Sequence, residues 1–137
     1  MNSALSALEG NWELIKAEMG GERAPEVLSR RTTLRLAENQ YWVYFDGLVT
    51  DHGLTEEGAA GRAKTLLLRG TDGPNVGRIL YCIYQHVGDR LRICYGLDGV
   101  MPDRFATREG EARYLATYRR MSAASSAAEN SFDDTVD

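Results

Sequence analysis

Short stretches in which apolar and aromatic residues alternate with polar ones fill most of the chain, and glycine-containing turns separate them. Such alternation over strand length, with turn residues between the stretches, is typical of antiparallel β-strands. The pattern predicts eight strands, at residues 11–19, 31–37, 40–46, 48–56, 63–69, 77–87, 90–96 and 111–120. Eight short consecutive strands favour an up-and-down β-barrel or a β-sandwich.

The turn Asp46-Gly47 sets the register of the first strong hairpin. Without a bulge, the pairing that starts at this turn places alternate residues on one face. The residues expected on that face are Tyr41, Val43, Phe45, Leu48, Thr50 and His52. Asp51 then lies on the opposite face from His52, so these two neighbours cannot act as a pair in one site.

The turn Gly88-Asp89 sets the register of a second hairpin. Arg90 and Arg92 are expected to point to solvent, which turns the residues between them inward. The expected inward set of this hairpin is Cys82, Tyr84, His86, Leu91, Ile93 and Tyr95. Leu66 and Leu68 alternate with polar or charged neighbours and are expected to face inward as well.

The outer face of the second hairpin carries Tyr81, Ile83 and Cys94. Apolar side chains at a surface indicate a covering helix or a contact with a second copy of the chain, so a homodimer is one expectation. Cys82 and Cys94 point in opposite directions in this register, and a disulfide between them is geometrically poor. For the strand at 111–120, the pattern leaves open which face is inside.

Composition predicts one globular domain over residues 1–121, followed by a tail. The tail, residues 122–137, is small, polar and acidic, and we expect it to be disordered. Residues 2–9 carry a capping serine and two leucines, and predict a short N-terminal helix. The net charge of −4 comes from the tail, because it holds four acidic residues and no basic ones.

Several classes of function are disfavoured by the sequence. The body without the tail has equal numbers of acidic and basic residues, so we expect no nucleic-acid partner. The chain has no long uncharged apolar run and no basic, apolar leader, so we expect no membrane partner and a cytoplasmic location. No cysteine spacing, dinucleotide fingerprint or P-loop is present, and we expect no cofactor and no metal.

Four segments resemble a small lipocalin-like domain family described from planctomycete and other bacterial genomes. The first is LEGNW at residues 8–12, which resembles the Gly-x-Trp opening of lipocalin-like barrels. The second is DGPNVG at residues 72–77. The third is the strand pair that contains Ile83-Tyr84 and GDRLRICY at 88–95. The fourth is the C-terminal part of the domain, with MPDRF at 101–105 and YRR at 118–120. The resemblance covers roughly residues 5–121 and implies an eight-stranded antiparallel up-and-down lipocalin-like β-barrel.

In such a barrel, the tryptophan of the first strand closes one end, and an arginine near the end of the last strand stacks on it. The resemblance assigns these places to Trp12 and to Arg119 or Arg120. The interior of an eight-stranded barrel is either filled by side chains or holds one small ligand.

Our leading hypothesis is that the interior binds a small apolar or amphipathic molecule in a hydrophobic cavity. The inward wall would supply apolar burial, and polar tips would orient the ligand. The residues expected to line the binding site are Tyr41, Val43, His52, Leu66, Leu68, Cys82, Leu91 and Ile93.

Two other hypotheses come from different classes of function. One is an intracellular enzyme of natural product biosynthesis, because barrels of this kind resemble bacterial cyclases. This cyclase or isomerase would use Tyr84, Tyr95 and His86 as hydrogen-bonding catalytic groups. Each of these residues also has a structural interpretation, as a hydrogen-bonded tyrosine of the core or, for His86, as part of the barrel floor. The other hypothesis is a protein-interaction module that uses the outer sheet.

Overall fold

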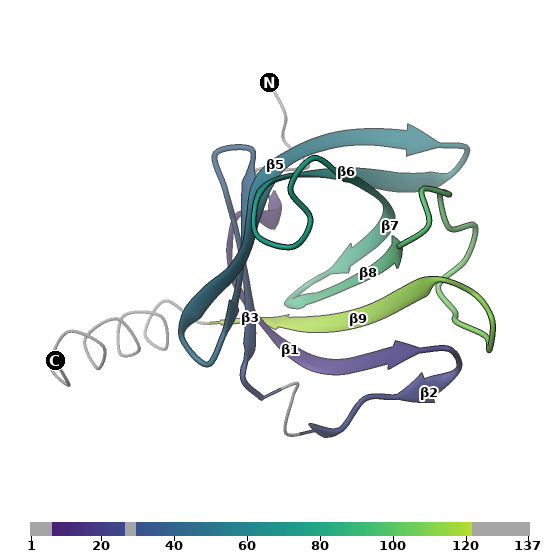
Figure 1. Cartoon of the computed structure of the whole chain (residues 1–137), viewed down its shortest axis with the longest axis horizontal. Helices are drawn as coiled ribbons and strands as arrows, with labels where there is room; N and C mark the ends of the chain where they lie inside the picture. The colour runs from purple at the N-terminus through teal and green to yellow at the C-terminus, as the bar shows by residue number, and fades with distance from the viewer. Residues whose placement is uncertain (1–6, 27–29, 122–137) are drawn as a thin grey trace, which may run out of the picture.

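The computed structural model describes residues 7–26 and 30–121. Within these residues, nine strands form one antiparallel sheet: β1 (Gly10–Met19), β2 (Glu22–Arg23), β3 (Thr32–Ala37), β4 (Gln40–Phe45), β5 (Leu48–Ala60), β6 (Ala63–Asp72), β7 (Ile79–Val87), β8 (Arg90–Gly96) and β9 (Arg113–Arg120). The order in the sheet follows the chain from β3 to β9, and β1 pairs with both β3 and β9. These eight strands therefore close into a barrel (Figure 1).

The eight expected strands are all present, which confirms the all-β architecture and selects the barrel over the sandwich. The short strand β2 was not expected; it pairs with the end of β1. The expected N-terminal helix at residues 2–9 falls largely outside the described residues, and the tail at 122–137 falls wholly outside them. In the described ranges, no helix has the length and apolar character needed to cross a bilayer.

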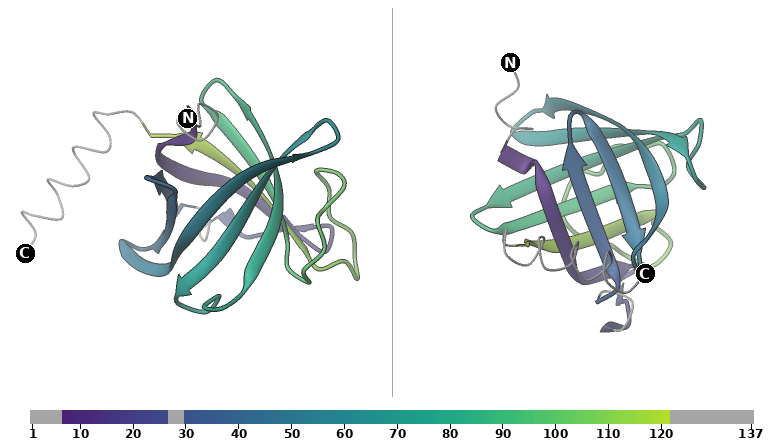
Figure 2. Two further views of the ribbon diagram at one scale, coloured as in Figure 1. Left: turned by 90° about the horizontal axis from the view of Figure 1, so that it is seen from above. Right: turned by 90° about the vertical axis from the view of Figure 1, so that its left-hand side faces the viewer.

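Two features shape the barrel around its interior. β5 is thirteen residues long and pairs with β4 over its first half and with β6 over its second half, so it turns the corner between them (Figure 2). A register shift between Leu14 and Lys16 in β1 adds a bend where β1 meets β9. Bulges of this kind increase the local twist that a closed barrel needs.

Trp12 lies at one end of the barrel, which we call the floor. Its side chain is fully buried, and its Nε1 donates a hydrogen bond to the carbonyl oxygen of Leu8 at 2.9 Å. The guanidinium carbon of Arg120 lies 4.3 Å from the centre of the indole ring. The expected cation–π contact is thus present, and it is made by Arg120, while Arg119 pairs with Glu13 on the outside.

The outer face of β7 and β8 is covered by the connection between β8 and β9, residues 97–112. Ile83 and Cys94 are buried beneath it, and the backbone of Ala106 hydrogen-bonds to the Cys94 sulfur. The guanidinium of Arg92 lies 4.3 Å from the centre of the Phe105 ring. Ile83 and Cys94 lie on the outer face of the wall, as expected, but they are covered by this loop and not by the expected helix.

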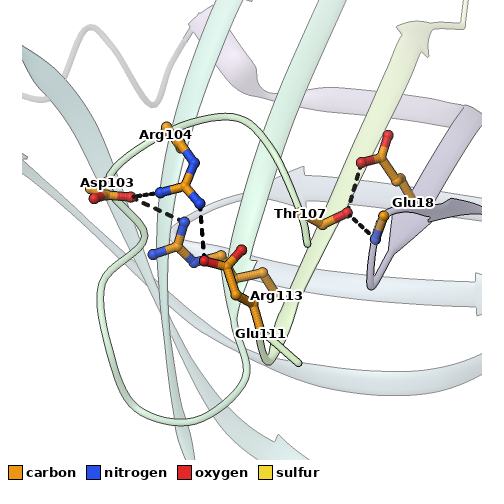
Figure 3. Close-up of polar contacts among 7 residues, drawn as sticks. Glu18, Asp103, Arg104, Thr107, Glu111 and Arg113 are labelled. Atoms are coloured by element: carbon orange, nitrogen blue, oxygen red, sulfur yellow. Dashed lines mark hydrogen bonds and ion pairs between the residues drawn. The ribbon is translucent and has the colours of Figure 1, made fainter. Parts of the chain in front are cut away.

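Ion pairs hold this connection in place (Figure 3). Asp103 binds both Arg104 and Arg113 at 3.0 Å, and Arg104 also binds Glu111 at 3.0 Å. The Arg113 hydrogen bond and the two arginine charges lower the pKa of Asp103. Nearby, the Thr107 hydroxyl donates to Glu18 at 2.7 Å and accepts from the backbone N–H of Gly21 at 2.9 Å, which ties the loop to the end of β1.

Candidate functional site

The barrel interior contains most of the residues that the sequence predicted for the site. The apolar and aromatic side chains that meet there come from β1, β3, β4, β6, β7, β8 and β9, and the expected members are Tyr41, Leu66, Leu68, Cys82, Tyr84, Leu91, Ile93 and Tyr95. All eight are buried, and Val43 packs against them while remaining partly exposed. In the second hairpin the structure shows the expected register, with Cys82 opposite Tyr95 and Tyr84 opposite Ile93.

The first hairpin departs from its expected register. Phe45 pairs with Leu48 and Tyr44 with Val49, but the next residue of β4, Val43, pairs with Asp51. Thr50 is the extra residue of this bulge, and its hydroxyl donates to the carbonyl oxygen of Val43 at 3.2 Å. One extra residue reverses the faces of every later position in the strand.

His52 therefore points outward, and the expectation that it lines the interior is wrong. It pairs with Trp42 and stacks on it, with ring centres 5.1 Å apart and planes 15° apart. Its Nδ1 lies 2.9 Å from a carboxylate oxygen of Asp72, and its Nε2 lies 3.0 Å from the amide oxygen of Gln40. These contacts fix the imidazole on the outer surface of the barrel.

Asp51 takes the inward place that we expected for His52. It is 9% exposed, and no other acidic or basic residue within the described ranges is as deeply buried. Its Oδ2 accepts hydrogen bonds from the Tyr41 hydroxyl at 3.3 Å and from the Asn75 amide at 2.8 Å, and its Oδ1 accepts from the backbone N–H of His52 at 3.1 Å. A carboxylate is thus set into the tyrosine-containing wall.

Asn75 belongs to the connection between β6 and β7, residues 73–78, which folds back onto the end of the sheet. Gly77 donates to the carbonyl oxygen of Gly70 at 3.0 Å, and a Cβ at Gly70 would collide with the Asn75 backbone. Glycine at position 70 thus lets the loop approach the sheet closely enough for Asn75 to reach Asp51. The expected assignment of DGPNVG as a turn is confirmed.

Tyr95 and Tyr118 form a second polar pair inside the barrel. Their hydroxyl oxygens are 2.6 Å apart, so that one hydroxyl donates to the other. Burial, and then the neighbouring ionisable groups, raise the pKa of both phenols well above the usual value. Tyr118 and Ala116 belong to the inward face of β9, which settles the question that the sequence left open for this strand.

Tyr84 lies on β7 and donates its hydroxyl to Glu57 of β5 at 3.4 Å. Burial raises the pKa of Tyr84 to about 12, and the Glu57 charge and hydrogen bond act in the same direction. The phenol therefore stays protonated at neutral pH and serves as a hydrogen-bond donor.

His86 lies at the floor beside Trp12. The two rings meet edge to face with their centres 5.6 Å apart, and Nε2 lies 2.8 Å from the carbonyl oxygen of Gly88. This placement fits the structural interpretation of His86 as a hydrogen-bonded histidine of the floor. The three residues proposed as catalytic, Tyr84, His86 and Tyr95, each bond a different partner, and their polar tips do not converge on one point.

The cysteines occupy opposite faces of the barrel wall, as expected. Both are free thiols; Cys82 faces the interior, and Cys94 lies beneath the β8–β9 connection. Burial raises the pKa of each thiol, so neither is activated as a nucleophile. Among residues 7–26 and 30–121, no three His, Cys, Asp or Glu side chains are grouped closely enough to hold a metal ion.

A hollow of about 160 Å³ lies on the outer surface between β5 and β6. Its lining residues are Leu54, Thr55, Glu56, Leu67 and Arg69. Of these, Leu54, Glu56 and Arg69 are exposed, so the hollow is open to solvent and separate from the barrel interior.

Sequence reasoning did not place Asp51, Asn75 or Tyr118 at the interior. Tyr118 could have been found, because it pairs with Leu91 of a strand whose inward face was known. Asp51 depended on the bulge at Thr50, and the consecutive polar residues Thr50, Asp51 and His52 fit either register equally well. Asn75 carries no signal of its own in the turn sequence.

Comparisons of the chain with protein-family models, with curated proteins and with solved structures each returned no match. The resemblance to lipocalin-like domains therefore depends on the motifs of the sequence alone and stays a prediction.

Proposed function

We propose that this barrel binds a small, largely apolar molecule in its interior. The observation that carries the proposal is the mixed character of the inward wall, where leucines and Ile93 accompany the polar tips of Tyr41, Asp51, Tyr95 and Tyr118. Apolar walls with a few converging polar groups are typical of small-molecule sites. The proposal also agrees with the resemblance of the sequence to lipocalin-like domains, whose eight-stranded barrels hold one small ligand.

The polar groups of the wall form hydrogen bonds with one another or with the β6–β7 loop. Tyr95 bonds Tyr118, and Asp51 bonds Tyr41 and Asn75. A ligand would exchange one of these contacts for its own, so that no buried polar atom loses a partner. Asn75 is the most readily exchanged of them, because it belongs to a largely exposed loop rather than to a strand.

The loop at residues 73–78 therefore offers the entry to the interior. It lies at the opposite end of the barrel from the Trp12 floor, which Arg120 and Leu8 close. A ligand that displaces Asn75 would reach the space beside Tyr41 and Leu68, between β4 and β6.

Native mass spectrometry of the protein purified from its host tests whether a small molecule accompanies it. A titration with hexan-1-ol, followed by NMR chemical shifts, tests the location. We expect saturable shifts at interior residues such as Leu68 and Leu80. Shifts confined to the outer hollow beside Leu54 and Leu67, or the absence of saturable binding, would contradict the proposal.

A matched pair of variants separates the inside of the barrel from its outside. Val43 packs against the core from β4, and Val49 on β5 is 53% exposed. Val43→Phe adds bulk to the interior and should weaken hexanol binding, while Val49→Phe adds the same bulk to the surface and should leave it unchanged. Equal effects of the two substitutions would place the binding outside the interior.

A further inference from the structure

We infer that the interior selects a ligand that carries a protonated amine, with Asp51 as its counter-ion. This inference depends on the proposed binding function and adds the chemical class of the ligand. It starts from the charge of the interior. Asp51 is the buried acid of β5, and Glu57, six residues further along the same inward face, is a second acid, which accepts a hydrogen bond from Tyr84.

No cation in the described part of the chain is paired with Asp51. The three hydrogen bonds to its carboxylate come from a phenol, an amide and a backbone N–H, all of them neutral. A carboxylate removed from water is costly unless a positive charge accompanies it, and neutral donors compensate for only part of that cost. The Asp51 carboxylate therefore has hydrogen-bond donors around it, but it has no positive charge beside it.

Neither His52 nor Lys64 supplies a positive charge to Asp51. His52, the neighbour of Asp51, is held outside by Trp42, Asp72 and Gln40. Lys64 pairs with Tyr84 and so lies on the inward side of β6, but it is exposed near the start of that strand, at the opposite end from Gly70, which pairs with Gly53 beside Asp51. The positive charge would thus come from the ligand.

An alkylammonium group matches this arrangement in charge and in geometry. It has three N–H donors, so it can replace the Asn75 amide at Oδ2 of Asp51 and still donate to a second acceptor. The Tyr41 hydroxyl is already at the same carboxylate oxygen and can accept from the ammonium. The attached apolar chain would lie along Leu66, Leu68 and Leu80, which face the interior on β6 and β7.

The test compares three six-carbon probes on the full chain by isothermal titration calorimetry at neutral pH: hexylamine, hexan-1-ol and hexanoate. We expect hexylamine to bind at least about tenfold more tightly than hexan-1-ol, and hexanoate to bind least, because opposite charges attract and like charges repel in a poorly hydrated site. Asp51→Asn should remove the preference for the amine, so that hexylamine binds no more tightly than hexan-1-ol.

Two further variants keep the result interpretable. Asp46→Asn changes an exposed acid in the β4–β5 turn and should leave the order of the three probes unchanged. Asn75→Ala removes the group that an ammonium would displace, so it should strengthen the binding of hexylamine more than that of hexan-1-ol. This second variant leaves the charge of Asp51 in place, so it remains informative if Asp51→Asn does not fold.

The outcomes separate the two proposals. Equal binding of hexylamine and hexan-1-ol, unaffected by Asp51→Asn, would overturn the amine assignment and leave interior binding intact. Failure of all three probes to bind would overturn both. If Asn75→Ala weakens hexylamine binding, then Asp51 serves to hold the β6–β7 loop and does not receive a ligand, and the inference is wrong.

Discussion

The guanidinium of Arg120 lies over the ring of Trp12 and at the same time binds the chain segment that precedes β1. Its carbon is 4.3 Å from the ring centre, and its Nη1 and Nη2 donate to the carbonyl oxygens of Glu9 and Ala7 at 2.7 and 2.6 Å. One side chain near the end of the described chain thus fixes both the tryptophan of the floor and the residues before it.

Replacing this arginine should open the floor. Arg120→Ala removes the stacking contact and leaves two carbonyl oxygens without their donor, so we expect a loss of about 1–3 kcal/mol in the free energy of unfolding. Arg120→Lys keeps the charge but lacks the two-pronged guanidinium that reaches both carbonyl oxygens, so its free energy of unfolding should lie between those of the wild type and Arg120→Ala. Chemical denaturation measures both. The control is Arg90→Ala, an exposed residue whose ion pair with Asp89 should contribute little. An Arg120→Ala effect no larger than that of Arg90→Ala would contradict the structural role of Arg120.

The buried hydroxyls of Tyr95 and Tyr118 should be energetically coupled. Tyr95→Phe or Tyr118→Phe alone leaves one buried hydroxyl without a partner, and each should cost about 1–3 kcal/mol of stability. The double variant removes both polar groups and should cost clearly less than the sum of the single changes. A double-mutant cycle by urea denaturation gives the coupling energy. Strict additivity would mean that the hydroxyls do not interact in solution.

Gly53 should not tolerate a side chain. It pairs with Tyr41, and a Cβ at this position would collide with the backbone of Arg69 and with the Tyr41 ring. We expect Gly53→Ala to destabilise the fold by about 3 kcal/mol, since the colliding backbone cannot move aside without disturbing β6. Gly58→Ala, on the same strand, would contact only the Thr65 hydroxyl and should cost less than about 1 kcal/mol. Thermal denaturation compares the two variants, and similar melting temperatures would argue against this packing at Gly53.

Stability should fall at alkaline pH. The pKa of Tyr84 rises from its usual value near 10 to about 12 on folding, and the pKa values of Tyr41, Tyr95 and Tyr118 are raised as well. The folded state therefore holds these protons more tightly than the unfolded state does. The resulting stabilisation is complete below pH 10 and is lost as the pH rises through the folded-state values. A titration to alkaline pH tests this: the tyrosinate absorbance reports ionisation of the phenols, and circular dichroism reports loss of the fold. If all seven tyrosines ionise together near pH 10 while the fold persists, the burial of these phenols is wrong.

The sequence predicted the second hairpin more accurately than the first, and the reason is local. In β8, Arg90 and Arg92 alternate with Leu91 and Ile93, so only one register buries the apolar residues, and it persists over all seven pairs with β7. In β5, Leu48 and Val49 place apolar residues on both faces, and the next three residues are polar on both faces, so burial does not favour either register. The sequence therefore could not predict the bulge at Thr50, and without the bulge it could not predict the inward position of Asp51.

The cover over Ile83 and Cys94 was missed for a different reason. The connection at residues 97–112 has no regular periodicity, and its hold on the barrel depends on ion pairs with Arg113 and on the contact between Thr107 and Glu18. These contacts join residues far apart in the sequence, and no pattern within one segment predicts them. The alternation of polar and apolar residues defined the wall of the barrel well, but not what lies against its outside.

The pairing of β1 with β9 has a consequence for how the protein acquires its structure during synthesis. Trp12 pairs with Arg120 and Leu14 with Tyr118, so one edge of β1 stays unpaired until β9 has been synthesised. Contacts between such distant residues form slowly, because the long intervening chain must first be brought together. While translation is under way, the nascent chain exposes the unpaired side of β1, and a chaperone that shields this side until β9 has emerged from the ribosome should raise the yield of the native protein.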